Sequence, residues 1–538
     1  MPTVRPWITS LAVLAAPSLA AQGKWVGPQP PCDIKANHFQ VSTASLNLKI
    51  AAENPAQRDR MLKQTQDVLT RAIIQNKQDK NPAAWYYFGR YYVEMGDAAG
   101  ADSTFAKAEA LAPQCAADIH EHRARIWTTT LNAGLQAWQE NKTDSAVALL
   151  RLAQRLVPES PDAYFRLGDL YAGQNQLDSA AAYLRQGITR AGHDTAWAAR
   201  RRDALATVAR LYQAQAEQDP AVQNWERTRG ARDSINRAVA ADSGVLARVL
   251  ASAASRRARG ARLAPADQAA FSRDSGARAQ AVDAGRAGRA ALLPRVTADS
   301  AAVQGAFAPA IAAYRDVATA YPQSLDAVAG LANIYAESGR SAEAAGFFDS
   351  LYAAPLPAAV VIDAGRRILG TGLLVAGTRV LSRGVNQSPV GRDALYDLAL
   401  GYYRMGDSAH ILPVAQRLVA LDPMNRASLR LLAGAWELKG RRDSTAKYNT
   451  LVESGLPVEI TVTSFAPDSA GAALSLTAVN LRTTPSAPLR LQVEFLDAKG
   501  AVLSAQTADL PALPPGQSQE SQLRASSKGV VGWRYRAL

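Results

Sequence analysis

The apolar side chains of this chain follow two different periods. From about Pro82 to residue 457 they recur every three or four residues, as on one face of an α-helix. After Leu456 the period changes to two, in the runs Val458–Val462, Ala473–Val479 and Leu489–Phe495. The pattern predicts a mainly α chain of paired helices, followed by a small β-sandwich of five or six short strands at residues 458–538.

The helical part also repeats at a longer interval, and the copy that begins at Pro82 is the most complete. Counted from Pro82, positions 4, 7, 8, 11, 20, 24, 27 and 32 hold Trp85, Phe88, Gly89, Tyr92, Ala101, Phe105, Ala108 and Pro113. The small residues at 8 and 20 let two helices approach closely, and proline at 32 ends the second helix. This spacing resembles the tetratricopeptide repeat of about 34 residues. The resemblance implies an α-solenoid that binds protein segments.

The same register returns along the chain. Further copies start at Trp127, Pro161, Leu325, Arg392 and Arg426, with a weaker copy over Ala359–Pro389. We therefore expect repeats at 82–219 and at 301–457. Residues 21–81 precede them, with two predicted helices, Thr43–Ala52 and Gln57–Asn76. Solenoids need an atypical terminal repeat, and we expect these two helices to form it.

One repeat is interrupted by a long insertion. Its first helix carries Tyr212 at position 11, but the matching second helix begins only near Ala310, so about 89 residues are inserted. The insert, residues 220–300, has no lysine, 14 arginines and 7 acidic residues. Turn signals in it predict about three helices that form an arm: Asp242–Gly244, Gly260, Pro265 and Pro294.

The positive charge of the insert allows two interpretations. The arginines could face an anionic lipid, a polysaccharide or an acidic partner, or they could form an ordinary solvated and salt-bridged surface. Only Trp225 and Phe271 could stack on bases, so no nucleic acid partner is expected.

The first twenty residues have the pattern of a bacterial secretory signal peptide. Arg5 is followed by the apolar stretch Ile8–Leu19, which is too short to span a bilayer, and cleavage is expected after Ala20. The alternative is an uncleaved anchor or a buried helix. Ala21 stands where a lipoprotein would have cysteine, and no later segment has 18 consecutive apolar residues. We predict an exported protein, periplasmic or secreted, without a transmembrane helix.

Composition narrows the chemistry. The chain of 538 residues has a net charge of +13 but only two cysteines and five histidines. In an exported protein Cys32 and Cys115 could form a disulfide, although they could also be unrelated thiols. Asp118 and His122 are spaced to share a metal ion, but two ligands do not make a site.

Catalytic and cofactor motifs are missing from the sequence. It contains no G-x-S-x-G, no H-E-x-x-H, no P-loop and no G-x-G-x-x-G. Gly370–Gly372 fits a turn between helices better than a nucleotide loop, and Ser444–Lys447 fits a solvated helix start better than an acyl-transfer motif. We predict no enzyme activity, no cofactor and no metal.

A solenoid of this kind usually binds its partner on the concave side, which positions near 2, 5, 9 and 12 of each first helix tend to line. Here those positions give Tyr86, Arg90, Trp138, Phe165, Arg166, Asp169, Arg210, Asn333, Tyr396, Tyr403 and Arg430. Tyrosine, tryptophan and arginine are typical of interaction hot spots. The alternative for each side chain is packing between repeats.

These features together predict a non-catalytic interaction scaffold or assembly factor of the bacterial cell envelope. The alternative is an envelope-surface protein that binds anionic lipid or polysaccharide through its insert. The lysine and asparagine clamp that chaperone-type repeats use for C-terminal carboxylates is absent. In the β-domain, Val493–Asp497 with Gly500 resembles exported bacterial domains of the FxLYD type.

Overall fold

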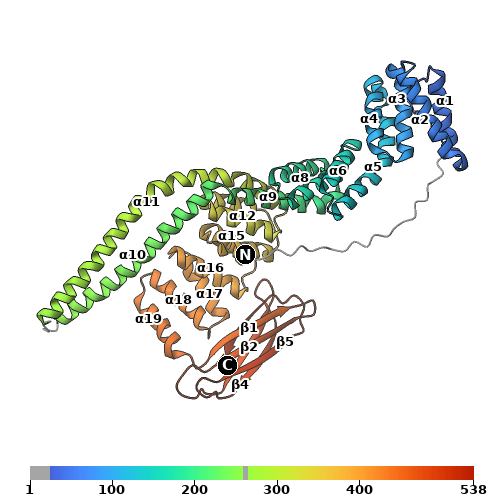
Figure 1. Cartoon of the computed structure of the whole chain (residues 1–538). Coiled ribbons are helices and arrows are strands. Elements are labelled where there is room, and N and C mark those ends of the chain that lie inside the picture. The colour runs from blue at the N-terminus through green and yellow to red at the C-terminus, as the bar shows by residue number, and fades with distance from the viewer. Residues whose placement is uncertain (1–24, 259–263) are drawn as a thin grey trace. The chain divides into compact units, whose positions relative to one another are not determined.

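The computed structural model describes residues 25–258 and 264–538. The predicted signal peptide and Gly260 lie outside the described residues. The described residues form nineteen α-helices and six β-strands (Figure 1). The predicted fold class, a helical solenoid followed by a small β-sandwich, is confirmed. The chain divides into two compact units, Met1–Ala198 and Ala199–Leu538, called unit 1 and unit 2 below.

Unit 1 is a stack of four helix pairs. The pairs are α1 (Phe39–Glu53) with α2 (Arg58–Ile74), α3 (Pro82–Met95) with α4 (Ala98–Leu111), α5 (Ala116–Gln139) with α6 (Thr143–Leu156), and α7 (Pro161–Gly173) with α8 (Leu177–Ala191). The length of α5 accounts for the extra residues between Cys115 and Trp127.

The ends of α3 show how the sequence sets the helix bounds. The side chain of Asn81 accepts a hydrogen bond from the backbone N–H of Ala83, and Pro82 occupies the first helical position. At the other end Gly96 adopts a left-handed conformation, with φ of 75°, which a residue without Cβ takes without strain. The turn into α4 therefore begins at Gly96.

Unit 2 continues the helix pairs. They are α9 (Ala198–Glu217), α10 (Pro220–Ala258), α11 (Pro265–Ala320), α12 (Leu325–Glu337), α13 (Ser341–Leu351), α14 (Ala358–Gly370), α15 (Leu374–Gln387), α16 (Arg392–Met405), α17 (Ile411–Leu421), α18 (Arg426–Leu438) and α19 (Arg442–Thr450). The C-terminal part of α11 serves as the partner helix of α9. Tyr314 of α11 is buried in one apolar cluster with Ala209 of α9, and its hydroxyl donates to Gln213 Oε1 at 3.1 Å.

In the described part of the inserted arm, residues 220–258 and 264–300, there are two helices instead of about three. Helices α10 and α11 lie side by side along their length (Figure 1). The expected break at Asp242–Gly244 lies inside α10, and Pro294 lies inside α11. One glycine among alanines costs a helix only about 1 kcal/mol. Contacts between the helices stabilise the longer form, because Asp242 pairs with Arg278 of α11 at 3.4 Å.

The β-domain consists of two antiparallel sheets with a shared core. Its strands are β1 (Glu459–Pro467), β2 (Ala472–Val479), β3 (Leu489–Leu496), β4 (Val502–Leu510), β5 (Ser518–Ala525) and β6 (Gly532–Ala537). One sheet has the order β1-β2-β5 and the other β4-β3-β6. Leu474 and Leu476 of the first sheet are buried in one cluster with Val493 and Phe495 of the second.

Close approach of the two helices in a pair depends on small residues at position 8. A Cβ on Gly168 would lie 2.6 Å from the side chain of Leu184, and a Cβ on Gly89 would overlap the ring of Phe105. At Gly365 the obstacle is backbone, since a Cβ there would lie 2.5 Å from the Leu381 nitrogen. Helix α14 therefore touches α15 through its main chain.

The substitution Gly365→Ala is expected to destabilise the protein by about 1–3 kcal/mol, because the backbone of α15 cannot move aside as a side chain could. Urea unfolding measures this change. The matched control is Gly346→Ala in α13, where a Cβ meets nothing within 4 Å. That change should raise stability by about 0.5–1 kcal/mol, as for any open helical glycine. Equal unfolding midpoints for wild type and Gly365→Ala would contradict the prediction.

Candidate functional site

The eleven predicted groove residues divide between the units, six in unit 1 and five in unit 2. Their exposure also divides them. Tyr86, Arg90 and Phe165 are buried, Trp138, Arg166, Asp169 and Tyr396 are partly exposed, and Arg210, Asn333, Tyr403 and Arg430 are exposed. The prediction that Tyr86, Arg90 and Phe165 offer an accessible surface to a partner is therefore wrong.

Phe165 is buried because it fills a gap within its own helix pair. A Cβ on Gly187 of α8 would lie 2.7 Å from the Phe165 ring, so the ring rests directly on that glycine. The ring of Trp197 packs against it with centroids 5.9 Å apart. In this repeat the side chain at position 5 is part of the core, as the alternative interpretation allowed.

Arg90 is buried for a different reason, because the chain's own N-terminal segment, residues 25–32, covers it. The Arg90 guanidinium donates from Nη1 to the carbonyl oxygen of Val26 at 2.7 Å. It also stacks on the indole of Trp25, with 3.7 Å between Cζ and the ring centroid. Further along, the backbone N–H of Gln29 donates to Asp118 Oδ1 at 2.9 Å, and Cys32 is joined to Cys115 by a disulfide.

A buried polar cluster lies beneath this segment. The Tyr86 hydroxyl donates to Asp118 Oδ2 at 2.6 Å and lies 3.1 Å from His122 Nε2. Burial, together with the charges of Arg90 and Arg125, lowers the pKa of His122 to about 3. His122 is therefore neutral at physiological pH, and its proximity to Asp118 is not an ion pair. Among the described residues no three His, Cys, Asp or Glu side chains gather where they could hold a metal ion.

Unit 2 contains an open pocket on the predicted groove face, here called the α9 pocket. It has a volume of about 560 Å³ and lies between α9, the end of α11 and the start of α12. Asp203, Ala206 and Arg210 stand at positions 2, 5 and 9 of α9, and Tyr314 and Tyr321 form the opposite wall. Of the predicted groove residues Arg210 alone is among those that line this pocket. The same positional rule, applied to α9 in full, would also have given Asp203 and Ala206.

The charges around the α9 pocket leave one cation without a carboxylate. Arg202 pairs with Asp203 at 3.2 Å, and Asp326 pairs with Arg367 at 3.7 Å. In the described part of the chain no carboxylate lies within ion-pair distance of Arg210, whose Nη2 donates to Thr207 Oγ1 at 3.1 Å. The pocket therefore presents an exposed guanidinium beside two aromatic side chains.

The other predicted residues of unit 2 lie outside this pocket. Asn333 is exposed on α12, and Arg430 is exposed on α18. The Tyr396 ring lies 5.1 Å from the Arg392 guanidinium. Tyr403 is 42 % exposed and rests on Gly434 of α18, where a Cβ would come within 2.7 Å of its ring. The structure does not bring these four side chains together into one site.

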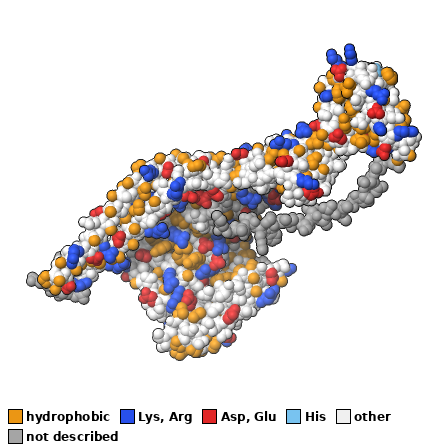
Figure 2. Space-filling model, in the orientation of Figure 1, with side chains coloured by type: hydrophobic (Ala, Val, Ile, Leu, Met, Phe, Trp, Pro, Cys, Tyr) orange, Lys and Arg blue, Asp and Glu red, His pale blue; other side chains and the backbone are white. Residues whose placement is uncertain are grey.

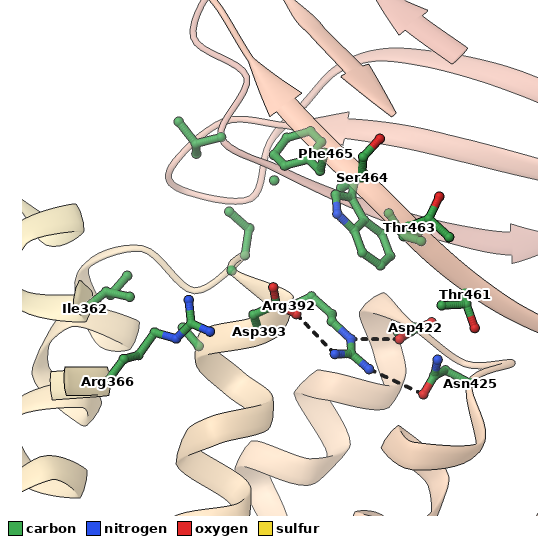
Figure 3. Close-up of a pocket in the computed structure, with 17 residues that line it drawn as sticks. Ile362, Arg366, Arg392, Asp393, Asp422, Asn425, Thr461, Thr463, Ser464 and Phe465 are labelled. Carbon is green, nitrogen blue, oxygen red and sulfur yellow. Dashed lines mark hydrogen bonds and ion pairs between the residues drawn. The ribbon is translucent and has the colours of Figure 1, made fainter. Parts of the chain in front are cut away.

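A second pocket, here called the junction pocket, lies between the last repeats and the β-domain (Figure 3). Its volume is about 330 Å³. Arg392 of α16 points into it and donates from Nε to Asp422 Oδ2 at 2.9 Å and from Nη2 to Asn425 Oδ1 at 3.3 Å. Arg366 nearby is paired with Asp397 at 2.6 Å. Both arginines are therefore already neutralised by the chain itself.

Asp422 connects the junction to the sheet. Its side chain is 1 % exposed, and Tyr535 of β6 donates its hydroxyl to Asp422 Oδ1 at 2.7 Å. The Tyr535 oxygen in turn accepts the backbone N–H of Met424 at 3.1 Å. Burial raises the pKa of Asp422, opposed by its bonds to Tyr535 and Arg392. Because these groups satisfy one another, the junction holds the β-domain to the repeats and is a weaker candidate for a ligand site.

Comparison with known proteins agrees with the repeat assignment. Residues 137–203 and residues 296–358 each match a family model described as a tetratricopeptide repeat. The second match spans the return of the interrupted repeat, from α11 into α13. Together with the helix pairs, the matches show that the solenoid contains tetratricopeptide repeats. Repeats of this class act in general as protein-interaction scaffolds.

Three solved structures are among those similar to this chain. MamA shares 24 % identity over 29 % of this chain and 91 % of its own, with a TM-score of 0.20. The pilF protein of Pseudomonas aeruginosa shares 11 % over 62 % and 94 %, also at 0.20. The Cut9–Hcn1 structure from the APC/C shares 13 % over 77 % and 88 %, at 0.21. At such scores the likeness carries no argument about function. No curated protein matches the chain.

Acid is expected to destabilise the buried cluster through His122. The unfolded histidine takes up a proton near pH 6.5, whereas the folded one does so only near pH 3. Between these values the unfolded state binds more protons, so stability falls as pH falls, by up to about 1.4 kcal/mol per pH unit. Urea unfolding of wild type and His122→Gln from about pH 7 to about pH 4.5 measures the difference. Parallel pH profiles for the two proteins would contradict the prediction.

Proposed function

We propose that this protein is a non-catalytic scaffold or assembly factor of the bacterial cell envelope, which binds a segment of a partner protein at the α9 pocket. The observation that carries the proposal is the pocket itself. It is open, it lies at positions 2, 5 and 9 of a first helix, and its volume is within the range of about 300–1,000 Å³ typical of binding pockets.

The chemistry of the α9 pocket defines the partner segment that would fit. Arg210 offers an unpaired guanidinium, which favours a carboxylate because charge-assisted hydrogen bonds are the strong ones. Tyr314 and Tyr321 offer aromatic surface, and Ala206 leaves room between them. We infer a segment with an acidic residue close to an apolar side chain.

Two features support a location in the cell envelope. The pattern at residues 1–20 is typical of a signal peptide for export, and the disulfide between Cys32 and Cys115 suits an oxidising compartment. Export, envelope partners and the FxLYD-type resemblance of the β-domain remain predictions. The same holds for the absence of enzyme activity, cofactor and nucleic acid partner.

The test is photocrosslinking in living cells with a photoreactive amino acid at position 206. We expect one discrete partner product, which decreases about tenfold when Arg210→Glu reverses the charge and persists with Arg210→Lys. The matched control position is Ser350, exposed on helix α13 away from the pocket lining. The same product from position 350, or a product from position 206 that is indifferent to Arg210→Glu, would contradict the proposal.

A second candidate function is binding of an anionic lipid or polysaccharide surface by the arm, and a stripe of arginines on α10 favours it. Arg227, Arg237, Arg248 and Arg256 are exposed, and among the described residues no carboxylate lies within ion-pair distance of them. At 100° per residue they fall within about 100° of one another around the helix. They span about 44 Å along it.

The helix that carries these arginines is rich in apolar residues. The segment Pro220–Arg256 contains an 18-residue stretch with a mean hydropathy of 1.2, none of it buried. Hydrophobic side chains lie among basic and acidic ones along the arm (Figure 2). By length and composition this helix could also cross a membrane, which for a single helix is weak evidence. A basic helix with apolar side chains between its charges suits the surface of an anionic bilayer.

The second candidate predicts salt-sensitive binding of the full chain to vesicles with about 30 % phosphatidylglycerol and not to neutral vesicles. The variant Arg237→Gln/Arg248→Gln/Arg256→Gln should bind at least tenfold more weakly, since each basic residue contributes about 1 kcal/mol. The matched control is Arg229→Gln/Arg232→Gln/Arg286→Gln, which removes three charges that are paired with Asp233 and Asp283. Equal losses of vesicle binding in both variants would show a general effect of net charge and would exclude the arginine stripe as the binding surface.

A further inference from the structure

The N-terminal segment of unit 1 lies where a partner segment would be expected. Tyr86 and Arg90 occupy positions 5 and 9 of α3, the positions that tend to line the binding face of a repeat. Residues 25–29 contact this face and the facing side of α5. The chain itself therefore occupies the first predicted part of the groove.

The contacts of this segment are of the kind that a bound peptide makes. Two of them use main-chain groups, the Val26 carbonyl on Arg90 and the Gln29 N–H on Asp118. The third is a side-chain anchor, the Trp25 indole stacked on the same guanidinium, a cation–π contact. Main-chain hydrogen bonds with one aromatic anchor are typical of the recognition of an extended peptide.

The segment rests on the helices and is not embedded among them. Val26 is 45 % exposed, and Gln29, Pro30 and Pro31 are also exposed. Below them, the Tyr86 hydroxyl joins Asp118 Oδ2 and His122 Nε2, while Asp118 Oδ1 faces the segment and accepts the N–H of Gln29. The helices α3 and α5 thus contact one another directly beneath the segment, which covers them.

The disulfide keeps this cover in place. Cys32 ends the segment and is joined to Cys115 at the start of α5, and both cysteines are buried. A tether of two residues, Pro30 and Pro31, between Gln29 and Cys32 gives the segment an effective concentration in the millimolar range. A free peptide of the same affinity cannot compete at ordinary concentrations.

We propose that residues 25–29 are a tethered ligand, which fills the Arg90–Asp118 face of unit 1 and closes it to partner segments. The ligand of this face is an extended peptide that begins with an aromatic residue. In the oxidised chain that ligand is residues 25–29 of the chain itself. The inference is independent of the α9 pocket, so either can fail without the other.

The test uses the full chain and a fluorescein-labelled peptide with the sequence of residues 25–31, followed by fluorescence anisotropy. We expect at least tenfold tighter binding to Trp25→Ala/Cys32→Ala/Cys115→Ala than to the wild type, because that variant loses the anchor and the tether but keeps the face. Adding Arg90→Gln should weaken binding at least tenfold. The matched control is Trp85→Ala, which removes a tryptophan stacked at 3.9 Å on Lys107 of α4, and it should leave the face closed.

Two outcomes of this assay would overturn the proposal. Equal binding to the wild type and the triple variant would show that the face is open. No binding to the triple variant would show that the contacts of residues 25–29 do not make a ligand site.

Hydrogen exchange of the wild type, measured by mass spectrometry, gives a test that needs no variant. After reduction with dithiothreitol, residues 25–32 should lose their protection while α3 and α5 keep theirs. Loss of protection in all three at once would show that the segment is an integral part of the fold, and the proposal would fall.

Discussion

The architecture depends on how closely two helices of a pair can approach. At position 8 of the first helix a side chain would collide with the second helix, with Leu184 opposite Gly168 and with the Leu381 backbone opposite Gly365. A glycine or alanine there lets large neighbours such as Phe105 close over the crossing. Each pair then exposes an apolar side that only the next pair can cover, so the repeats are stable as a stack and not singly.

This constraint explains which parts of the fold could be predicted from the sequence. The helix pairs could, because a small residue at position 8 and large ones around it recur in phase from Pro82 onward. The arm could be located because the second helix of one repeat is missing at the usual spacing. Its two-helix form could not be predicted, because Asp242–Gly244 and Pro294 are typical of turns. Neighbouring alanines and contacts with the opposite helix keep these residues helical. Strand β5 is largely polar and lies at a sheet edge, so little alternation marks it.

The candidate sites were predictable only in part, and for a related reason. The rule that positions 2, 5, 9 and 12 of a first helix line the groove considers one helix at a time. Through Arg210 it correctly leads to the α9 pocket. The rule does not predict that Val26, 64 residues before Arg90, lies on the same face of α3 as Arg90. Nor can it see that Tyr535 reaches back 113 residues to Asp422 and joins the β-domain to the repeats. Both contacts join residues that are far apart in the sequence, and no local sequence pattern predicts such a pairing.

The helix α11 has a mechanical consequence. It runs without interruption from the tip of the arm to Tyr314 and Val317 in the core of a repeat, 56 residues or about 84 Å. A rod fixed at one end in a packed core acts as a lever, so a sideways load on the arm becomes a torque on the stack at its base. Pro294 and Pro309 each remove a backbone hydrogen bond from this rod and are the points where it can bend. They divide the helix into a long distal part, a middle part between the two prolines, and a short stem that packs with α9 and α12.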